Sequence, residues 1–308
     1  LLQDSSDEWK EKILYWLKVF FIINCSIAIV ERGLSTIIFR PTVEAVFESF
    51  RSYALLGHPL NNSLVTGFLT LFFMIVSEGT AKKFFYLGLG IMAIFAFGGR
   101  TALAAVILAF PFILYFDLKN YNSEEAAGKF FNYLFLFILM LSLCAVVLVA
   151  TPFGERIFAS SKFDDDSADV RSRVFDMFRH FNASDLVLGI DERKILTVMY
   201  LEKVDIIENF WIIWIFKYGF VLTALLALFL VRFLYSLFHH LDVAVRFLLL
   251  FVFFLIASGN NSMATNTTAV SIITLASLVG FGAYSYQTEE DLLYEEDIHR
   301  YTRLQSEG

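Results

Sequence analysis

The stretch GGRTALAAVILAFPF, residues 98–112, joins the end of one long apolar segment to the start of another. Arg100 follows its two glycines and therefore stands at the N-terminal end of an apolar helix. Helix N-termini carry unpaired N–H groups and a partial positive charge. An arginine at this place suits a phosphate-type anion, and the alternative is an arginine that only anchors a helix end at the bilayer surface.

The composition is that of a protein that crosses a membrane several times. Of 308 residues, 57% are hydrophobic and 18% are charged, whereas soluble domains contain about 45–50% apolar and about 25% charged residues. The net charge of −7 argues against nucleic acid as a partner. Cys25 and Cys144 fall within apolar segments, which indicates packing rather than a disulfide or a metal site. Since no HExxH, CxxC or P-loop pattern occurs, we expect no metal and no other cofactor.

We predict an all-α membrane protein with about eight transmembrane helices in a single domain, residues 1–308. A large loop at 151–208 and an acidic tail at 287–308 complete the domain. Because the chain begins at Leu1, we also expect further N-terminal spans in a longer protein. The predicted spans are 13–30, 62–77, 83–98, 101–117, 130–150, 209–235, 244–258 and 268–286.

Basic residues predict the orientation of these spans. Lysines and arginines flank the connections 78–82, 118–129 and 236–243, which alternation of the spans places on one side. The positive-inside rule makes that side cytoplasmic, and the acidic tail lies there too. The connections on the outer side are then 31–61, 98–100, 151–208 and 259–267.

Two segments of the outer loops have amphipathic patterns. Pro41 suits the first turn of a helix in the first loop, with an apolar stripe running to Phe50. In the second loop we expect a helix from about Val170, capped by Ser167 or Asp169, and a following segment that ends at Gly189. The predicted apolar face of that second helix consists of Val170, Val174, Phe175, Phe178 and Phe181.

Ionisable residues are concentrated outside the predicted spans. The main exceptions are Lys18 and Lys217, which lie within spans. Coupled transporters usually need carboxylates near the bilayer midplane, so this distribution argues against one. The guanidinium fork binds phosphate oxygens in pairs, which suits a lipid-linked anionic substrate at the outer surface. The alternative for each loop arginine is an ion pair with a loop carboxylate. The outer arginines are Arg32, Arg40, Arg51, Arg100, Arg156, Arg171, Arg173, Arg179 and Arg193.

Four motifs follow one another between residues 50 and 225. They are Arg51–Asn61 before a span, Gly99-Arg100-Thr101, Arg171-Ser172-Arg173 with Leu186–Gly189, and Glu208–Trp211 with Gly219-Phe220-Val221. Together they resemble the motifs of the O-antigen polymerase/ligase family of bacterial membrane glycosyltransferases. Gly99 stands where the family has serine, a change that we expect to matter little. Glu208 stands where its ligases have histidine, which favours a polysaccharide polymerase over a lipopolysaccharide ligase.

The resemblance implies a GT-C-like fold in the bacterial inner membrane, with the active site on the periplasmic face. It implies transfer of a glycan from undecaprenyl pyrophosphate, without a metal, to a sugar hydroxyl on another lipid-linked glycan. In the ligase relatives the acceptor is a lipid or a protein. Membrane lipid and other polysaccharide-assembly proteins are the further partners that it implies.

The resemblance also implies roles for individual residues. Glu208 would be the general base, since a carboxylate can activate a hydroxyl as histidine does. Arg100 and Arg173 would act beside it in catalysis. The pyrophosphate clamp would comprise Arg100, Arg171 and Arg173, with Arg51 and Arg179 as secondary members. The alternative bases are His58 and His180, each of which can instead be an ordinary loop residue, and Asn209 is a further candidate.

Two rival functions stay open from the sequence alone. A flippase or exporter of lipid-linked sugars would also bind pyrophosphate with arginines, but it needs a polar cavity across the membrane. The spans contain too few charges to line one. The other rival is a non-catalytic scaffold of a polysaccharide machine.

Overall fold

The computed structural model describes residues 7–39, 50–119, 121, 123–151, 172–264 and 268–281. Within these ranges every regular element is a helix, so the predicted all-α class is confirmed there. The helix expected after Pro41, the start of the second loop with Arg171, and the tail at 287–308 lie outside the described residues.

Six of the predicted spans are helices long and apolar enough to cross a membrane. Two shorter apolar helices, α11 (Val243–Ser258) and Ala269–Phe281, coincide with the remaining two, whose crossing stays a prediction. The fold is therefore that of a helical membrane protein. The six long helices are α1 (Asp7–Leu34), α2 (Pro59–Val76), α3 (Thr80–Phe97), α4 (Arg100–Leu118), α5 (Ser123–Ala150) and α10 (Phe210–Leu237).

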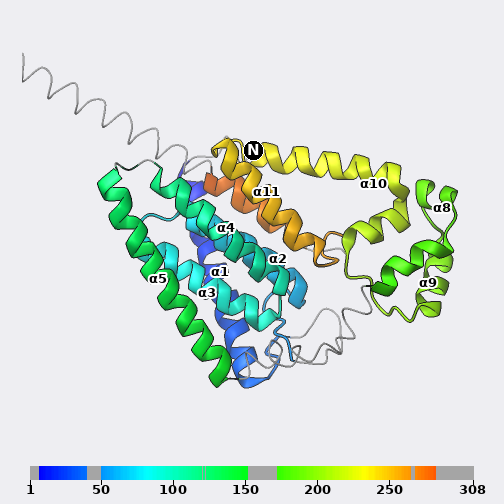
Figure 1. The fold of residues 1–308 in the computed structure, drawn as a ribbon, viewed down its shortest axis with the longest axis horizontal. Helices are drawn as coiled ribbons and strands as arrows, with labels where there is room; N and C mark the ends of the chain where they lie inside the picture. Colours follow the sequence, from blue (N-terminus) through cyan, green and yellow to red (C-terminus); the bar gives the residue numbers. More distant parts are fainter. Residues whose placement is uncertain are drawn as a thin grey trace, which may run out of the picture.

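Helix α2 forms the centre of the bundle, where it packs against α1, α3, α4 and α11 (Figure 1). Its phenylalanines Phe72 and Phe73 are fully buried. The ring of Phe72 meets Phe281 edge to face at 5.0 Å, and Phe73 stacks on Tyr86 at 4.9 Å between centroids. In the most apolar 18-residue stretch of α2, 78% is buried inside the protein, whereas in the corresponding stretch of α5 only 11% is buried. Helix α5 therefore offers most of its apolar surface to lipid.

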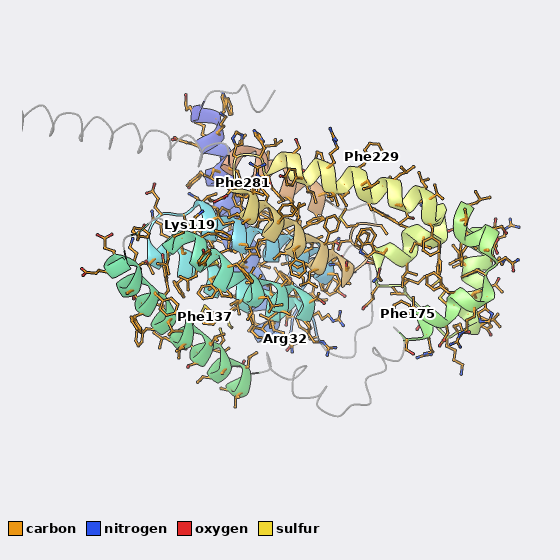
Figure 2. The ribbon with its side chains drawn as sticks, turned by 45° about the horizontal axis from the view of Figure 1, so that its top comes forward. Arg32, Lys119, Phe137, Phe175, Phe229 and Phe281 are labelled. Atoms are coloured by element: carbon orange, nitrogen blue, oxygen red, sulfur yellow. The ribbon has the colours of Figure 1, made fainter. Side chains whose placement is uncertain are left out.

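The connections between helices meet at two opposite ends of the bundle. At one end Lys83 pairs with Asp117, and Lys119 lies 3.6 Å from Asp242. The opposite end holds Arg32 in the last turn of α1, and Figure 2 shows it far from Lys119. Helix α1 continues to Leu34, past the predicted end of the first span at residue 30.

The predicted single span 209–235 is wrong in one respect, because α10 breaks at Gly219. This glycine has φ 76° and ψ 167°, which no helix residue adopts. Figure 1 shows α10 turning sharply at this point beside α8 (Ala183–Leu188). The break leaves Lys217 two residues before the corner, near the end of the first segment rather than inside a continuous span.

A second hydrophobic core joins the loop to the first segment of α10. We call residues 172–207 the loop unit; it contains η2 (Met177–His180), α8 and α9 (Glu192–Leu201). The expected apolar face is partly wrong, because Phe175 is 63% exposed while Met177 is buried. A tightening to a 3₁₀ turn at Met177 changes which side chains point inward. The buried members of this core are Val174, Met177, Phe181, Ile190, Val198, Val204, Ile207, Ile212 and Phe216.

The backbone of α8 fits against the corner in α10. A Cβ added to Gly219 would lie 2.1 Å from the carbonyl oxygen of Val187. The amide of Ile190 donates to the carbonyl of Phe216 at 2.7 Å, and Gly189 ends α8 as the sequence predicted. The loop unit is thus fixed to α10 by direct backbone contact.

We predict that Gly219→Ala destabilises the protein by at least about 1–3 kcal/mol, because only glycine tolerates this backbone region and the added methyl group collides with Val187. Thermal unfolding of the purified protein in detergent measures the loss. Gly128→Ala is the matched control: it lies in α5 with open space around it, and alanine favours a helix there. Equal melting temperatures for the two variants would contradict the proposed contact.

Candidate functional site

A pocket opens where the connections of the predicted outer side meet. Arg51, Arg100 and Glu208, which come from three separate segments, all line it. The cavity measures about 50 Å³, whereas one water molecule needs about 10–15 Å³. It therefore has room for several waters or for one phosphate-sized group. Two cations and one carboxylate face this space together.

The N-terminus of α4 forms one wall of the pocket. Gly98 ends α3 in the left-handed conformation, at φ 71°, and α4 begins two residues later at Arg100. Gly99, at the N-cap, has no side chain that could accept from the first turn. Thr101 and Ala102 of this turn line the pocket, and the first amides of a helix have no partner within it. A bound anion would cap this helix end.

Gly99 has a steric role that the sequence motifs did not indicate. A Cβ at this position would lie 2.3 Å from the hydroxyl oxygen of Ser63 on α2. That glycine in place of serine matters little for function stays a prediction. Ser63 occupies the space that a serine at position 99 would need, and it lines the same pocket.

Glu208 is held just before α10 by three contacts of its neighbours. The side chain of Asn209 caps α10 by accepting from the amides of Trp211 at 2.9 Å and Ile212 at 3.3 Å. The amide of Phe210 donates to the carbonyl of Asn260 at 3.2 Å. The structure thus gives Asn209 the work of a helix cap, and it ties the start of α10 to the end of α11.

His58 lies at the start of α2, within electrostatic reach of the pocket. Burial lowers the pKa of His58, Arg51 lowers this pKa further, and Glu208 acts in the opposite direction. Burial and the charge of Arg51 thus both favour the neutral form of the imidazole. Its Nδ1 is buried and has no hydrogen-bond partner among the residues that the structure describes.

Three other predicted site residues, described below, lie in the loop unit and do not line the pocket. Arg173 donates to the carbonyl of Lys203 at 3.1 Å. Arg179 is 82% exposed and pairs with Asp176 at 3.1 Å, which matches the alternative of an ordinary surface ion pair. His180 contacts Glu202 at 2.6 Å. The position of Arg171 is not described.

The structure adds polar residues to the site that the sequence did not single out. Ser63 comes from α2, and Asn260 comes, with Gly259, from the connection after α11. The polar run SGNNS at 258–262, between two apolar segments, was the available signal for this connection. Among the described residues no group of histidine, cysteine and carboxylate side chains could hold a metal ion.

Comparisons of the chain with family models, with curated proteins and with solved structures find no match. The site is therefore interpreted from its own geometry and from the four sequence motifs.

We predict that Gly99→Ser destabilises the protein by about 1–3 kcal/mol, the usual cost of overpacking a close contact. Adding Ser63→Gly removes the opposing hydroxyl, so the double variant should lose less stability than the sum of the two single variants. Thermal unfolding of the three variants in detergent gives the coupling. Strictly additive losses would show that positions 63 and 99 do not compete for one space.

Proposed function

We propose that the protein is a membrane glycosyltransferase that uses a glycan on a polyprenyl pyrophosphate, such as undecaprenyl pyrophosphate, as donor. A polysaccharide polymerase of the O-antigen polymerase/ligase type, with a GT-C-like fold, is the form that we favour. One observation carries the proposal: Arg51, Arg100 and Glu208 belong to three motifs far apart in the sequence, yet they line one pocket.

The pocket has the groups that this transfer needs. The acceptor hydroxyl oxygen attacks the anomeric carbon, and the bond from that carbon to the pyrophosphate oxygen breaks. The carboxylate of Glu208 takes the hydroxyl proton. The guanidinium groups of Arg51 and Arg100 and the amides of Thr101 and Ala102 in the first turn of α4 take up the negative charge that develops on the leaving pyrophosphate.

The geometry changes the emphasis among the arginines. Arg51, a secondary member of the clamp by resemblance, lines the pocket with Arg100, whereas Arg173 and Arg179 contact other parts of the loop unit. We therefore assign the pyrophosphate clamp to Arg51 and Arg100. The active site would face the periplasm if the basic connections are cytoplasmic, as the positive-inside rule predicts.

The deciding experiment is incubation of the purified protein in liposomes with lipid-linked repeat units. Longer glycans together with released lipid pyrophosphate would support a polymerase, and transfer to a lipid or protein acceptor would support a ligase. Movement of the lipid across the bilayer without elongation would support a flippase and contradict the proposal.

We predict that Arg100→Ala lowers the rate of transfer by about 10²–10³-fold, the scale of one lost donor to a developing oxyanion. Arg100→Lys should recover little of this rate, because lysine keeps the charge but loses the two-pronged geometry. Initial rates in the elongation assay measure both effects. Arg193→Ala, an exposed arginine in α9, is the control and should transfer normally. A normal rate for a folded Arg100→Ala protein would remove Arg100 from the clamp.

We predict that Glu208→Gln lowers transfer by about 10²–10⁴-fold while donor binding stays nearly intact, because glutamine keeps the size but cannot take a proton. Single-turnover rates and donor binding, measured separately, distinguish this loss from misfolding. Glu192→Gln, an exposed carboxylate in α9, should leave both quantities unchanged. Full transfer by Glu208→Gln would exclude this base and direct attention to His58, which interacts electrostatically with Arg51 and Glu208.

A further inference from the structure

Glu31 is a buried carboxylate that lies outside the pocket. It stands in the last turns of α1 and is 0% exposed. One carboxylate oxygen accepts from the amides of Ile38 at 2.9 Å and Phe39 at 3.3 Å. The other accepts from the amides of Tyr53 at 2.9 Å and Ala54 at 3.0 Å. The carboxylate therefore joins two chain segments that enter and leave the first outer loop.

The same carboxylate also accepts from the hydroxyl group of Ser52. A buried charge is costly unless hydrogen bonds to the charged form compensate it. Five donors from the backbone and from one serine provide this compensation, and hydrogen bonds to a charged acceptor are the stronger kind. The carboxylate thus fixes the local backbone much more firmly than a single neutral contact would.

Further hydrogen bonds hold residues 50–55, which we call the arginine segment because Arg51 lies in it. Arg32 donates to the carbonyl of Phe50, and the amide of Ser52 donates to the carbonyl of Ala96 at 3.1 Å. The amide of Leu55 donates to the side chain of Asn24 at 3.1 Å. Contacts from α1 and α3 therefore fix the backbone on both sides of Arg51.

These contacts fix the backbone from which the side chain of Arg51 extends. The backbone of the arginine segment is attached to α1 through Glu31 and to the end of α3 through Ala96, and α4 with Arg100 begins four residues after Ala96. The two arginines of the pocket are consequently attached to the same helix end. A displacement of the backbone at residues 52–54 would therefore move Arg51 relative to Arg100.

We infer that Glu31 is a positioning residue: it holds the arginine segment so that Arg51 and Arg100 bind one pyrophosphate-type anion together. This inference rests on the proposed function for the identity of the anion. It assigns Glu31 no contact with the substrate and no proton transfer, because its carboxylate acts through the hydroxyl group of Ser52 and the amides of Tyr53 and Ala54, directly after Arg51.

A double-mutant cycle between Glu31→Gln and Arg51→Ala tests the inference. Inorganic pyrophosphate is the probe, and titration calorimetry on the purified protein measures its Kd. Glutamine presents an amide group where the carboxylate accepted from N–H donors, so Glu31→Gln should raise Kd about tenfold or more. In the Arg51→Ala background Glu31→Gln should cause almost no further rise. Its effect on thermal stability should be the same in both backgrounds.

Two further variants keep the test decisive. Glu11→Gln, an exposed carboxylate on the same helix, should leave Kd unchanged. Ser52→Ala removes only one of the five donors and should raise Kd in the same direction by a smaller factor, even if Glu31→Gln fails to fold. An unchanged Kd for Ser52→Ala and Glu31→Gln, or an equal rise for Glu31→Gln in both backgrounds, would overturn the positioning role.

Hydrogen exchange separates this inference from the proposed function. The amides of Tyr53 and Ala54 should exchange faster in Glu31→Gln than in the unaltered protein, with no ligand present. Unchanged exchange would overturn the role of Glu31 whatever the protein binds. Failure of the unaltered protein to bind pyrophosphate, combined with faster exchange in the variant, would instead contradict the proposed function and leave Glu31 as the anchor of this segment.

Discussion

The pocket depends on a close approach of helix ends that only glycine permits. Gly99 meets Ser63 of α2, and a Cβ on Gly259 would lie 2.5 Å from the hydroxyl oxygen of Thr101. The start of α4 is thereby pressed between α2 and the end of α11. Because neither glycine has a side chain, Ser63 and Thr101 fit into this junction, and they line the pocket together with Arg100.

The remaining parts of the site are fixed relative to this junction by backbone hydrogen bonds. The carbonyl of Asn260, beside Gly259, accepts a hydrogen bond from the amide of Phe210, and this contact holds Glu208 at the pocket. The corner at Gly219 then lets α10 turn away, so that the loop unit packs on its first segment and the rest of the helix runs separately. A straight helix in the same place would have no surface that fits the backbone of α8.

Much of the fold could be predicted from the sequence because membrane spans follow from the length of apolar runs. The position of Arg100 at a helix start followed from two glycines between such runs. The corner in α10 could not be predicted, because Gly219 stands within an apolar run. The need for glycine there comes from a contact with Val187, 32 residues earlier in the chain. Glu31 and Arg32 were expected in a loop, because adjacent charges usually mark the end of a span. Their burial depends on partners from the arginine segment.

The candidate site was predicted in part. The resemblance named Arg51, Arg100 and Glu208, and the structure brings these three together. It also named loop arginines, but an arginine in a polar loop has many carboxylates within reach, and the sequence does not indicate which one it meets. Arg179, for example, pairs with Asp176 three residues away. Ser63 and Asn260 carry no charge that would mark them in the sequence. They line the pocket only because α2, α4 and α11 converge at it.

We propose that Arg51, Arg100 and Glu208 surround one pyrophosphate-binding pocket. A cryo-EM structure of the protein in lipid nanodiscs with undecaprenyl pyrophosphate tests this most directly. We expect phosphate density between Arg51 and Arg100, at the first turn of α4 and within reach of Glu208. Phosphate density bound instead by Arg173 and Arg179 in the loop unit, with the pocket at α4 empty, would contradict it.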